Sequence, residues 1–73
     1  MDYLIYENNL RQLRKNKSIS QKELAILVEC SRSNISNIEN SKQDTTLRMA
    51  GCIARVLKVS VVDIFPWLEE KVQ

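Results

Sequence analysis

One glycine and one proline stand in this chain of 73 residues, and their scarcity constrains the fold more than any other feature. Glycine and proline mark the turns that join short strands, so an all-β fold would need many more of them. Helices are therefore the expected regular structure. A chain of this length forms one domain with a thin hydrophobic core, so we treat residues 1–73 as a single unit.

The chain has no histidine and only two cysteines, Cys30 and Cys52. Histidine-dependent acid–base or triad chemistry is excluded, and one chain cannot supply the four Cys/His ligands of a structural zinc site. We expect no enzyme, no metal or other cofactor and no small-molecule ligand. Both cysteines occupy apolar positions of the helical pattern, which predicts packing in the core; a Cys30–Cys52 disulfide is the alternative.

No segment of the sequence indicates a membrane or a secretory route. The longest apolar run, Leu24 to Val28, has five residues, whereas a membrane helix needs about 20. The first residues lack the basic region and small-residue cleavage site of a secretory signal. We expect a cytoplasmic protein without a membrane partner.

Residues that favour helix N-caps divide the chain into amphipathic segments. Ser20 and Glu23 have the spacing of a capping box, and Ser31, Ser60 and one of the pair Thr45 and Thr46 stand at similar starts. Pro66 ends the last segment. The expected helices span residues 9–16, 21–28, 32–39 and 61–65, with a fourth in chain order that runs from the cap at Thr45 or Thr46 to about Leu57. Only about three residues separate the second from the third, which predicts a sharp corner.

The third expected helix, residues 32–39, has an unusual composition. Ile35 and Ile38 are its only apolar residues, whereas Leu24, Leu27 and Val28 form the apolar stripe of the helix before it. The side opposite the isoleucines presents short polar groups without a carboxylate: Arg32, Ser33, Ser36, Asn37 and Asn40. Asparagine pairs with adenine and arginine with guanine in the major groove of DNA. An ordinary solvent-exposed face is the alternative, although such faces more often contain Glu–Lys pairs.

The charge is distributed unevenly along the chain. The net charge of the whole chain is only +2, but residues 9–48 contain eight basic and four acidic residues, a net charge of +4. Residues 49–73 contain three of each. The positive excess therefore lies on the segment with the sharp corner, where a nucleic-acid partner would benefit from it.

Residues 21–25 (Gln-Lys-Glu-Leu-Ala) and 31–40 (Ser-Arg-Ser-Asn-Ile-Ser-Asn-Ile-Glu-Asn) closely resemble the Cro/repressor-type (XRE-like) helix-turn-helix family of transcription regulators. The resemblance extends over residues 9–65, about three quarters of the chain. It implies an all-α, five-helix, lambda-repressor-like domain with its core at 9–65 and its helix-turn-helix at 21–40. It also implies a homodimer that binds double-stranded operator DNA.

The resemblance assigns roles to individual residues. Ala25 is the small residue that allows the third helix to approach closely, and Arg14 and Glu39 match positions that often pair. The residues at base-reading positions are Arg32, Ser33, Asn34, Ser36 and Asn37. Those at phosphate-contacting positions are Gln21, Asn40, Lys42 and Gln43. The alternatives for Gln21 and Lys42 are ordinary exposed side chains.

Three positions depart from the family pattern, which places glycine after the second, third and fourth helices. Glu29, Ser41 and Lys58 stand there instead. A non-glycine residue in the left-handed conformation costs about 1–2 kcal/mol. Either these turns are remodelled or their strain lowers the stability. The glycine that is present, Gly51, lies inside the fourth helix, which predicts close packing by another helix, with chance as the alternative.

The C-terminal part of the sequence predicts a dimer interface. Apolar side chains gather there, namely Ile64, Phe65, Trp67 and Leu68, and the tail 66–73 is the expected dimerisation segment. Packing into the core of one chain is the alternative. A short β pairing between residues 3–6 and 67–70 is a further expectation, since some short family members have such an addition.

These observations lead to two functional hypotheses. The first is a homodimeric transcription regulator, a repressor, that reads an inverted repeat through the major groove with the helix at 32–39. The second is an antitoxin or adaptor that uses the same fold to hold a protein partner. The short tail after Phe65 leaves little chain for wrapping around a toxin.

Overall fold

The computed structural model describes residues 7–68, and the regular structure of this part is entirely α-helical. Its helices are α1 (Leu10–Asn16), α2 (Gln21–Leu27), α3 (Arg32–Glu39), α4 (Leu47–Leu57) and α5 (Val61–Ile64). The all-α fold class with five helices is thereby confirmed, with no strand between residues 7 and 68. Residues 3–6, 69 and 70 of the expected β pairing lie outside the described residues.

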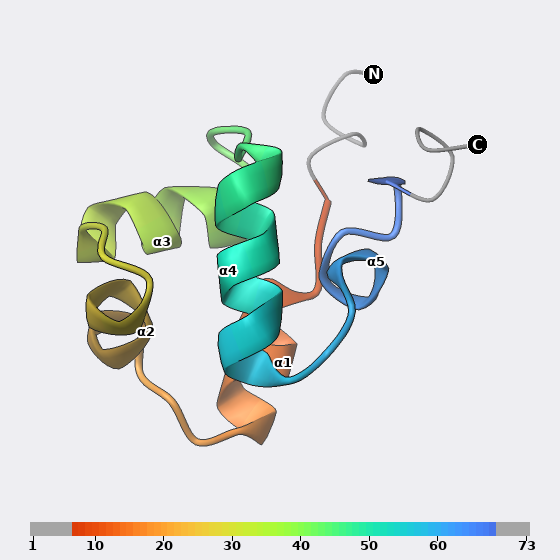
Figure 1. The fold of residues 1–73 in the computed structure, drawn as a ribbon. Helices are drawn as coiled ribbons and strands as arrows, with labels where there is room; N and C mark the ends of the chain where they lie inside the picture. The colour runs from red at the N-terminus through yellow and green to blue at the C-terminus, as the bar shows by residue number, and fades with distance from the viewer. Residues whose placement is uncertain (1–6, 69–73) are drawn as a thin grey trace.

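The helices surround a core to which every one of them contributes. In Figure 1, α4 stands in the middle, α2 and α3 lie together on one side of it, α5 lies on the other side and α1 lies behind. The largest fully buried side chains are Leu10, Leu24, Ile35, Ile38, Ile53, Leu57, Ile64 and Phe65. Each such side chain stabilises the fold by roughly 1.5–3 kcal/mol. Burial of Ile35 and Ile38 fixes which side of α3 faces outward.

Hydroxyl side chains start four of the helices. Ser20, Ser31 and Thr46 each accept a hydrogen bond at 3.0 Å from the backbone N–H three residues later, and Ser60 accepts one at 3.3 Å. The expected capping box at Ser20 is present, and Ser60 forms a second one with Asp63. The expected starts are confirmed, with Thr46 rather than Thr45 as the cap of α4.

The start of α1 is built differently, through contacts between distant segments. Asn9 has no side-chain cap bond; its Nδ2 donates to the carbonyl of Asp63 at 3.0 Å, and its backbone N–H donates to that of Ile64 at 2.8 Å. Asn8 Nδ2 donates to the carbonyl of Ile38 at 2.9 Å. The two asparagines therefore tie the beginning of α1 to the ends of α5 and α3.

Four helix ends share one construction with a left-handed residue. After α2, Glu29 N donates to the carbonyl of Ile26 at 3.2 Å, and Cys30 N donates to that of Ala25 at 2.9 Å, which is a Schellman motif. The same pair of bonds follows α1, α3 and α4. The left-handed residues are Ser18, Glu29, Ser41 and Lys58, with φ of 57°, 59°, 59° and 60°. The turns that lack the family's glycine are therefore not remodelled, and the one at Ser18 was not anticipated.

Three of these turns continue into the next helix in the same way. The left-handed residue is followed by one residue that packs against the core and then by the serine that caps the next helix. The segments are 18–20, 29–31 and 58–60. Because each corner combines a Schellman motif with an N-cap, it has little freedom, and the angle between α2 and α3 is set locally.

Several sequence-based expectations about packing are wrong. Leu27 is 58% exposed, because α2 turns Leu24, Ala25 and Val28 toward the core and leaves Leu27 at the edge of that stripe. Cys52 is exposed on α4 and does not pack in the core, whereas Cys30 is half-buried and packs against the core as predicted. Both are free thiols, so the alternative of a disulfide is excluded. A Cβ at Gly51 would meet no atom within 4 Å, so close helix packing does not explain that glycine.

Candidate nucleic-acid interface

The outward side of α3 is a continuous polar surface. Arg32 and Ser33 are exposed, and Asn34, Ser36 and Asn37 are half-buried. Arg32, Ser33, Ser36 and Asn37 line a shallow hollow of about 190 Å³. The acidic residue of α3, Glu39, does not reach this surface, because its side chain is fully buried. The five predicted base-reading residues thus lie together on a face without a carboxylate from α3.

The carboxylate of Glu39 joins three helices on the opposite side. Its Oε2 accepts a hydrogen bond from Arg14 Nε at 2.6 Å, and its Oε1 accepts from Arg14 Nη2 at 3.3 Å and Gln21 Nε2 at 3.0 Å. Arg11 Nε approaches Oε1 at 3.4 Å. Arg14 also donates to the carbonyl of Ile19 at 2.8 Å. This Glu39 cluster (Arg11, Arg14, Gln21 and Glu39) links the ends of α1 and α3 to the first turn of α2.

Burial and pairing act in opposite directions on Glu39. Burial raises the pKa of the carboxyl, whereas hydrogen bonds from Arg14 and Gln21, the charge of Arg14 and the hydrogen bond from Arg11 lower it. The pairing is the stronger influence, so the pKa of Glu39 lies below its ordinary value of 4.5. The group is therefore a charged partner of Arg14 at neutral pH. The Arg14–Glu39 pair implied by the resemblance is present and buried.

Two of the residues at predicted phosphate-contacting positions, Gln21 and Asn40, have side-chain partners within the protein. Gln21 is half-buried and uses its amide N–H on Glu39. Asn40 Oδ1 accepts from Arg11 Nη2 at 2.6 Å, and Asn40 Nδ2 donates to Ser36 Oγ at 3.3 Å. The side chain of Lys42 is exposed. The structure thus places Gln21 and Asn40 at the C-terminal end of α3, with Lys42 in the loop that follows.

Gln43 lies across the face rather than beside it. Its Nε2 donates to Asn34 Oδ1, and its Oε1 accepts from Asn37 Nδ2 at 3.3 Å. The sequence placed Gln43 in the loop after α3 but did not reveal these bonds. Arg11 was also missed, although its spacing of three residues from Arg14 on α1 puts both guanidinium groups on the side that faces α3.

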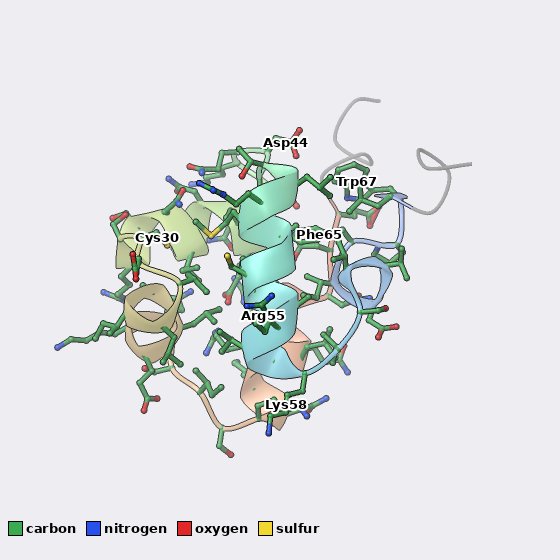
Figure 2. All side chains as sticks on the ribbon, in the orientation of Figure 1. Cys30, Asp44, Arg55, Lys58, Phe65 and Trp67 are labelled. Carbon is green, nitrogen blue, oxygen red and sulfur yellow. The ribbon has the colours of Figure 1, made fainter. Side chains whose placement is uncertain are left out.

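The C-terminal apolar residues divide into two pairs. Ile64 and Phe65 are buried in the core of the single chain, at 0% and 2% exposure, which is the alternative that the sequence left open. Trp67 and Leu68 are only partly buried. The rings of Phe65 and Trp67 meet edge to face with centroids 6.2 Å apart, beside α4 (Figure 2). Only Trp67 and Leu68 have surface left for a partner.

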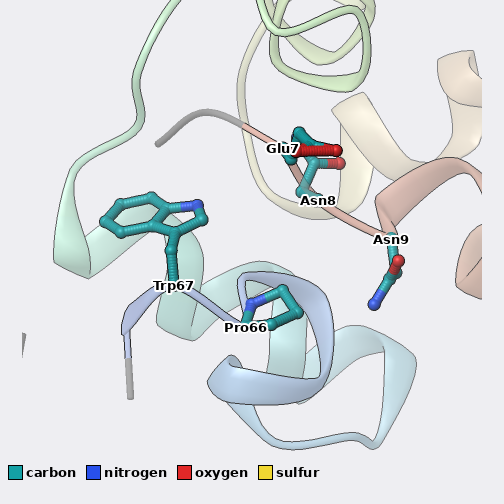
Figure 3. Close-up of a pocket in the computed structure, with 5 residues that line it drawn as sticks. All are labelled: Glu7, Asn8, Asn9, Pro66 and Trp67. Carbon is teal, nitrogen blue, oxygen red and sulfur yellow. The ribbon is translucent and has the colours of Figure 1, made fainter. Parts of the chain in front are cut away.

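A pocket of about 310 Å³ lies next to Trp67. Figure 3 shows Pro66 and Trp67 on one side of it and Glu7, Asn8 and Asn9 on the other. The indole N–H of Trp67 is buried and has no acceptor among the described residues. Such a donor is unusual, because most buried polar groups have a hydrogen-bond partner.

The helices of residues 7–68 include none that is both long and apolar enough to cross a membrane. A family model described as helix-turn-helix matches residues 10–64. No match was found among curated protein sequences.

Solved structures of proteins named as regulators, controllers or transcription factors resemble this chain. The restriction-modification controller protein C.AhdI from Aeromonas hydrophila has a TM-score of 0.77 and 28% identity, over 88% of this chain and 97% of that chain. A hypothetical transcription factor, NHTF from Neisseria, has a TM-score of 0.73 and 29% identity, over 97% and 82%. The clp gene regulator ClgR from Corynebacterium glutamicum shares the fold, with a TM-score of 0.74 and 22% identity over 85% and 66%.

The helix-turn-helix model spans all five helices. Of the two stretches that resemble Cro/repressor-type regulators, 21–25 lies in α2, and 31–40 covers α3 with one residue on each side of it. The buried Arg14–Glu39 pair and the polar outward side of α3 agree with that match. The chain belongs to the XRE-like helix-turn-helix family of DNA-binding regulators.

Proposed function

We propose that this protein is a homodimeric repressor that reads an inverted repeat of operator DNA with α3. The observation that supports this best is the outward side of α3, where amide, hydroxyl and guanidinium groups lie together while the Glu39 carboxylate is turned inward. In the helix-turn-helix mode, two such helices enter successive major grooves about 34 Å apart. The names of two similar structures, a restriction-modification controller protein and a hypothetical transcription factor, agree with a regulatory role.

The proposed DNA contacts follow from the placement of each side chain. Arg32, Ser33, Asn34, Ser36 and Asn37 would face base edges. Arg32 suits guanine, and Asn37 suits adenine, because these pairings supply two hydrogen bonds each. Gln21, Asn40 and Lys42, at the C-terminal end of α3 and just beyond it, would contact phosphates, the role that the sequence also predicted for Gln43. The net charge of +4 on residues 9–48 would strengthen the attraction.

Selection of bound sequences from a random DNA pool tests this proposal. The expected result is one motif with two-fold symmetry and half-sites one helical turn apart. A gel-shift series should then give nanomolar binding to that motif that weakens steeply with salt. Equal binding to selected and random DNA at physiological salt would contradict the proposal.

We propose that Trp67 and Leu68 form the dimer contact. Both side chains are partly exposed and Pro66 beside them is exposed, so their uncovered apolar surface is available to a second copy of the chain. Sedimentation equilibrium should show a dimer for the protein and a monomer for Trp67→Ala. Cys52→Ala, on the exposed side of α4, is the control and should leave the dimer intact. A Trp67→Ala dimer as stable as the parent would contradict this contact.

A different observation favours the second candidate, a protein-interaction module. Leu27, Val28, Met49 and Cys52 contribute to a hollow of about 340 Å³ between α2 and α4. Leu27 and Ile26, its neighbour in the sequence, are 58% and 65% exposed. Such exposed apolar groups are typical of contact sites for proteins. If this is the main function, Leu27→Gln should abolish binding of a neighbour-encoded partner in a pull-down while leaving DNA binding unchanged. Loss of DNA binding in the same variant would favour the first candidate.

A further inference from the structure

We infer that Gln43 is a specificity-determining residue that decides which hydrogen-bonding groups Asn34 and Asn37 present to DNA. It would act through these two asparagines rather than by contacting a base, so it is a positioning residue. The inference rests on the proposed function of α3 as the helix that reads DNA. It replaces the simpler role of a phosphate contact, which the sequence predicted for Gln43.

The contacts of Gln43 span one turn of the outward side of α3. Its amide N–H₂ donates to Asn34 Oδ1, and its carbonyl oxygen accepts from Asn37 Nδ2 at 3.3 Å. The backbone holds the loop in place, because Lys42 N donates to the carbonyl of Asn37 at 2.8 Å and closes the turn after α3. Gln43 is therefore fixed at both ends, by its backbone neighbour and by the two asparagine side chains.

This bridge leaves the two asparagines with different free groups. A side-chain amide has one oxygen that accepts and one N–H₂ group that donates. The oxygen of Asn34 is engaged by Gln43, so its N–H₂ faces outward and suits guanine O6 or N7 or thymine O4. Asn37 uses one N–H on Gln43, so its oxygen and second N–H are available, which suits the N6 and N7 pair of adenine.

The two asparagines are engaged through opposite groups, one through its oxygen and one through its nitrogen, whichever way the Gln43 amide is oriented. A half-turn of that amide would exchange the engaged groups, so that Asn34 would present its oxygen and Asn37 its N–H₂. In either orientation one asparagine is engaged through its oxygen and the other through its nitrogen. Gln43 thus couples the preferences at two base positions of each half-site.

Two substitutions of Gln43 separate these roles. In Gln43→Glu, the carboxylate only accepts, so both asparagines must donate to it, and Asn34 should turn its oxygen outward. The base preferred opposite Asn34 should then change to adenine or cytosine, which offer an amino donor in the major groove, while the preference opposite Asn37 stays. In Gln43→Met, both amides are released, and the preference at both positions should weaken by about tenfold.

The experiment is selection from a random DNA pool with the parent protein, Gln43→Glu, Gln43→Met and the control Gln12→Glu. Gln12 is exposed on α1, so its substitution adds the same charge away from the bridge and should leave the selected motif unchanged. Thermal melts should show that all four proteins fold, because Gln43 is exposed as well.

The outcomes distinguish this inference from the proposed function. A parent protein that selects no motif overturns the reading role of α3 itself. A parent motif that both Gln43 variants select unchanged, with uniformly weaker binding, makes Gln43 a phosphate contact and overturns the inference alone. A changed preference opposite Asn34 in Gln43→Glu, together with relaxed preferences in Gln43→Met, supports it.

Discussion

The two sides of α3 each contain a hydrogen-bonded polar network, but burial gives them different consequences. On the inward side, the Glu39 cluster surrounds a carboxylate with no exposed surface, and Arg14 has only 8% of its side chain exposed. On the outward side, Gln43 bridges Asn34 and Asn37 in contact with solvent. The inward network contains buried charges that pair with each other, whereas the outward amides can replace their protein partners with water.

The inward network therefore holds α3 in its position, and the outward network sets which hydrogen-bonding groups α3 presents on its surface. A buried ion pair that loses one member leaves an unpaired charge in the core, so the structure depends on it. Exposed amide bonds contribute little to stability, because water replaces them in the unfolded chain. We therefore expect substitutions on the inward side to change stability and those on the outward side to change DNA recognition.

The largest effect is expected for Glu39→Ala. Removing the carboxylate leaves the Arg14 guanidinium buried without its charged partner, which should lower the free energy of unfolding by about 3–5 kcal/mol. Arg11→Ala removes the exposed arm of the same cluster and should cost no more than about 1 kcal/mol. Urea unfolding followed by circular dichroism measures both. Equal losses in the two variants would remove the distinction between buried and exposed partners.

The next effect is expected for Arg32→Ala on the outward side. The variant should retain its free energy of unfolding within about 0.5 kcal/mol, yet lose about 1–3 kcal/mol of discrimination at one base position in each half-site. Competition gel shifts with single-base variants of the selected site measure this loss.

Lys42→Ala provides the matched comparison within the outward side. It should weaken binding to all sequences alike and reduce the slope of log K against log salt by about 1. If Arg32→Ala also weakened all sequences alike, or unfolded the domain, the outward side would not be a reading surface.

A smaller effect is expected at the corner between α2 and α3, which orients α3 without either network. Glu29 has a φ of 59°, and Glu29→Gly should relieve this strain and stabilise the domain by about 1 kcal/mol, observed as a higher melting temperature. Arg55→Gly, at an exposed position of α4, is the control and should destabilise by about the same amount. A lower melting temperature for Glu29→Gly would show that the corner is not strained.

The smallest effect is expected for the stability at acid pH, because burial offsets part of the lowering of the Glu39 pKa that its partners cause. The pKa of Glu39 is lowered from 4.5 in the folded protein, so its contribution to stability is present above that value and is lost as the pH falls through the folded pKa. Urea unfolding between about pH 3 and 6 should show a decline that is shallower in Glu39→Gln. Parallel profiles for the two proteins would contradict this role.

Local signals in the sequence predicted the helices well. Ser20, Ser31 and Ser60 each bind a backbone N–H only three residues away, so the chain around them contains all that is needed to start a helix. Contacts between distant residues were harder to predict. The bridge of Gln43 to Asn34 spans nine positions, and that of Arg11 to Asn40 spans 29. Neither has a pattern that can be read along the chain.

Errors arose where exposure depends on neighbouring helices. Leu27 and Cys52 belong to apolar runs, yet α2 and α4 meet along a narrower contact than those runs suggested, and both side chains are outside it. Ile64 and Phe65 show the opposite case, because both are buried in the core of the single chain while Trp67 and Leu68 are only partly buried. Periodicity identifies a helix face but does not say how wide the covered part is.

The scarcity of glycine and proline, the hydroxyl caps and the composition of residues 32–39 were enough by themselves to indicate a helix-turn-helix with a polar third helix. These features act within a few residues, so the sequence displays them directly. The tertiary structure alone decided that Glu39 faces inward while Asn34, Asn37 and Gln43 form one bridge outward. Burial and long-range hydrogen bonds form only when α1, α2 and α3 pack together. The stability of α3 and the polar groups on its outward side depend on both.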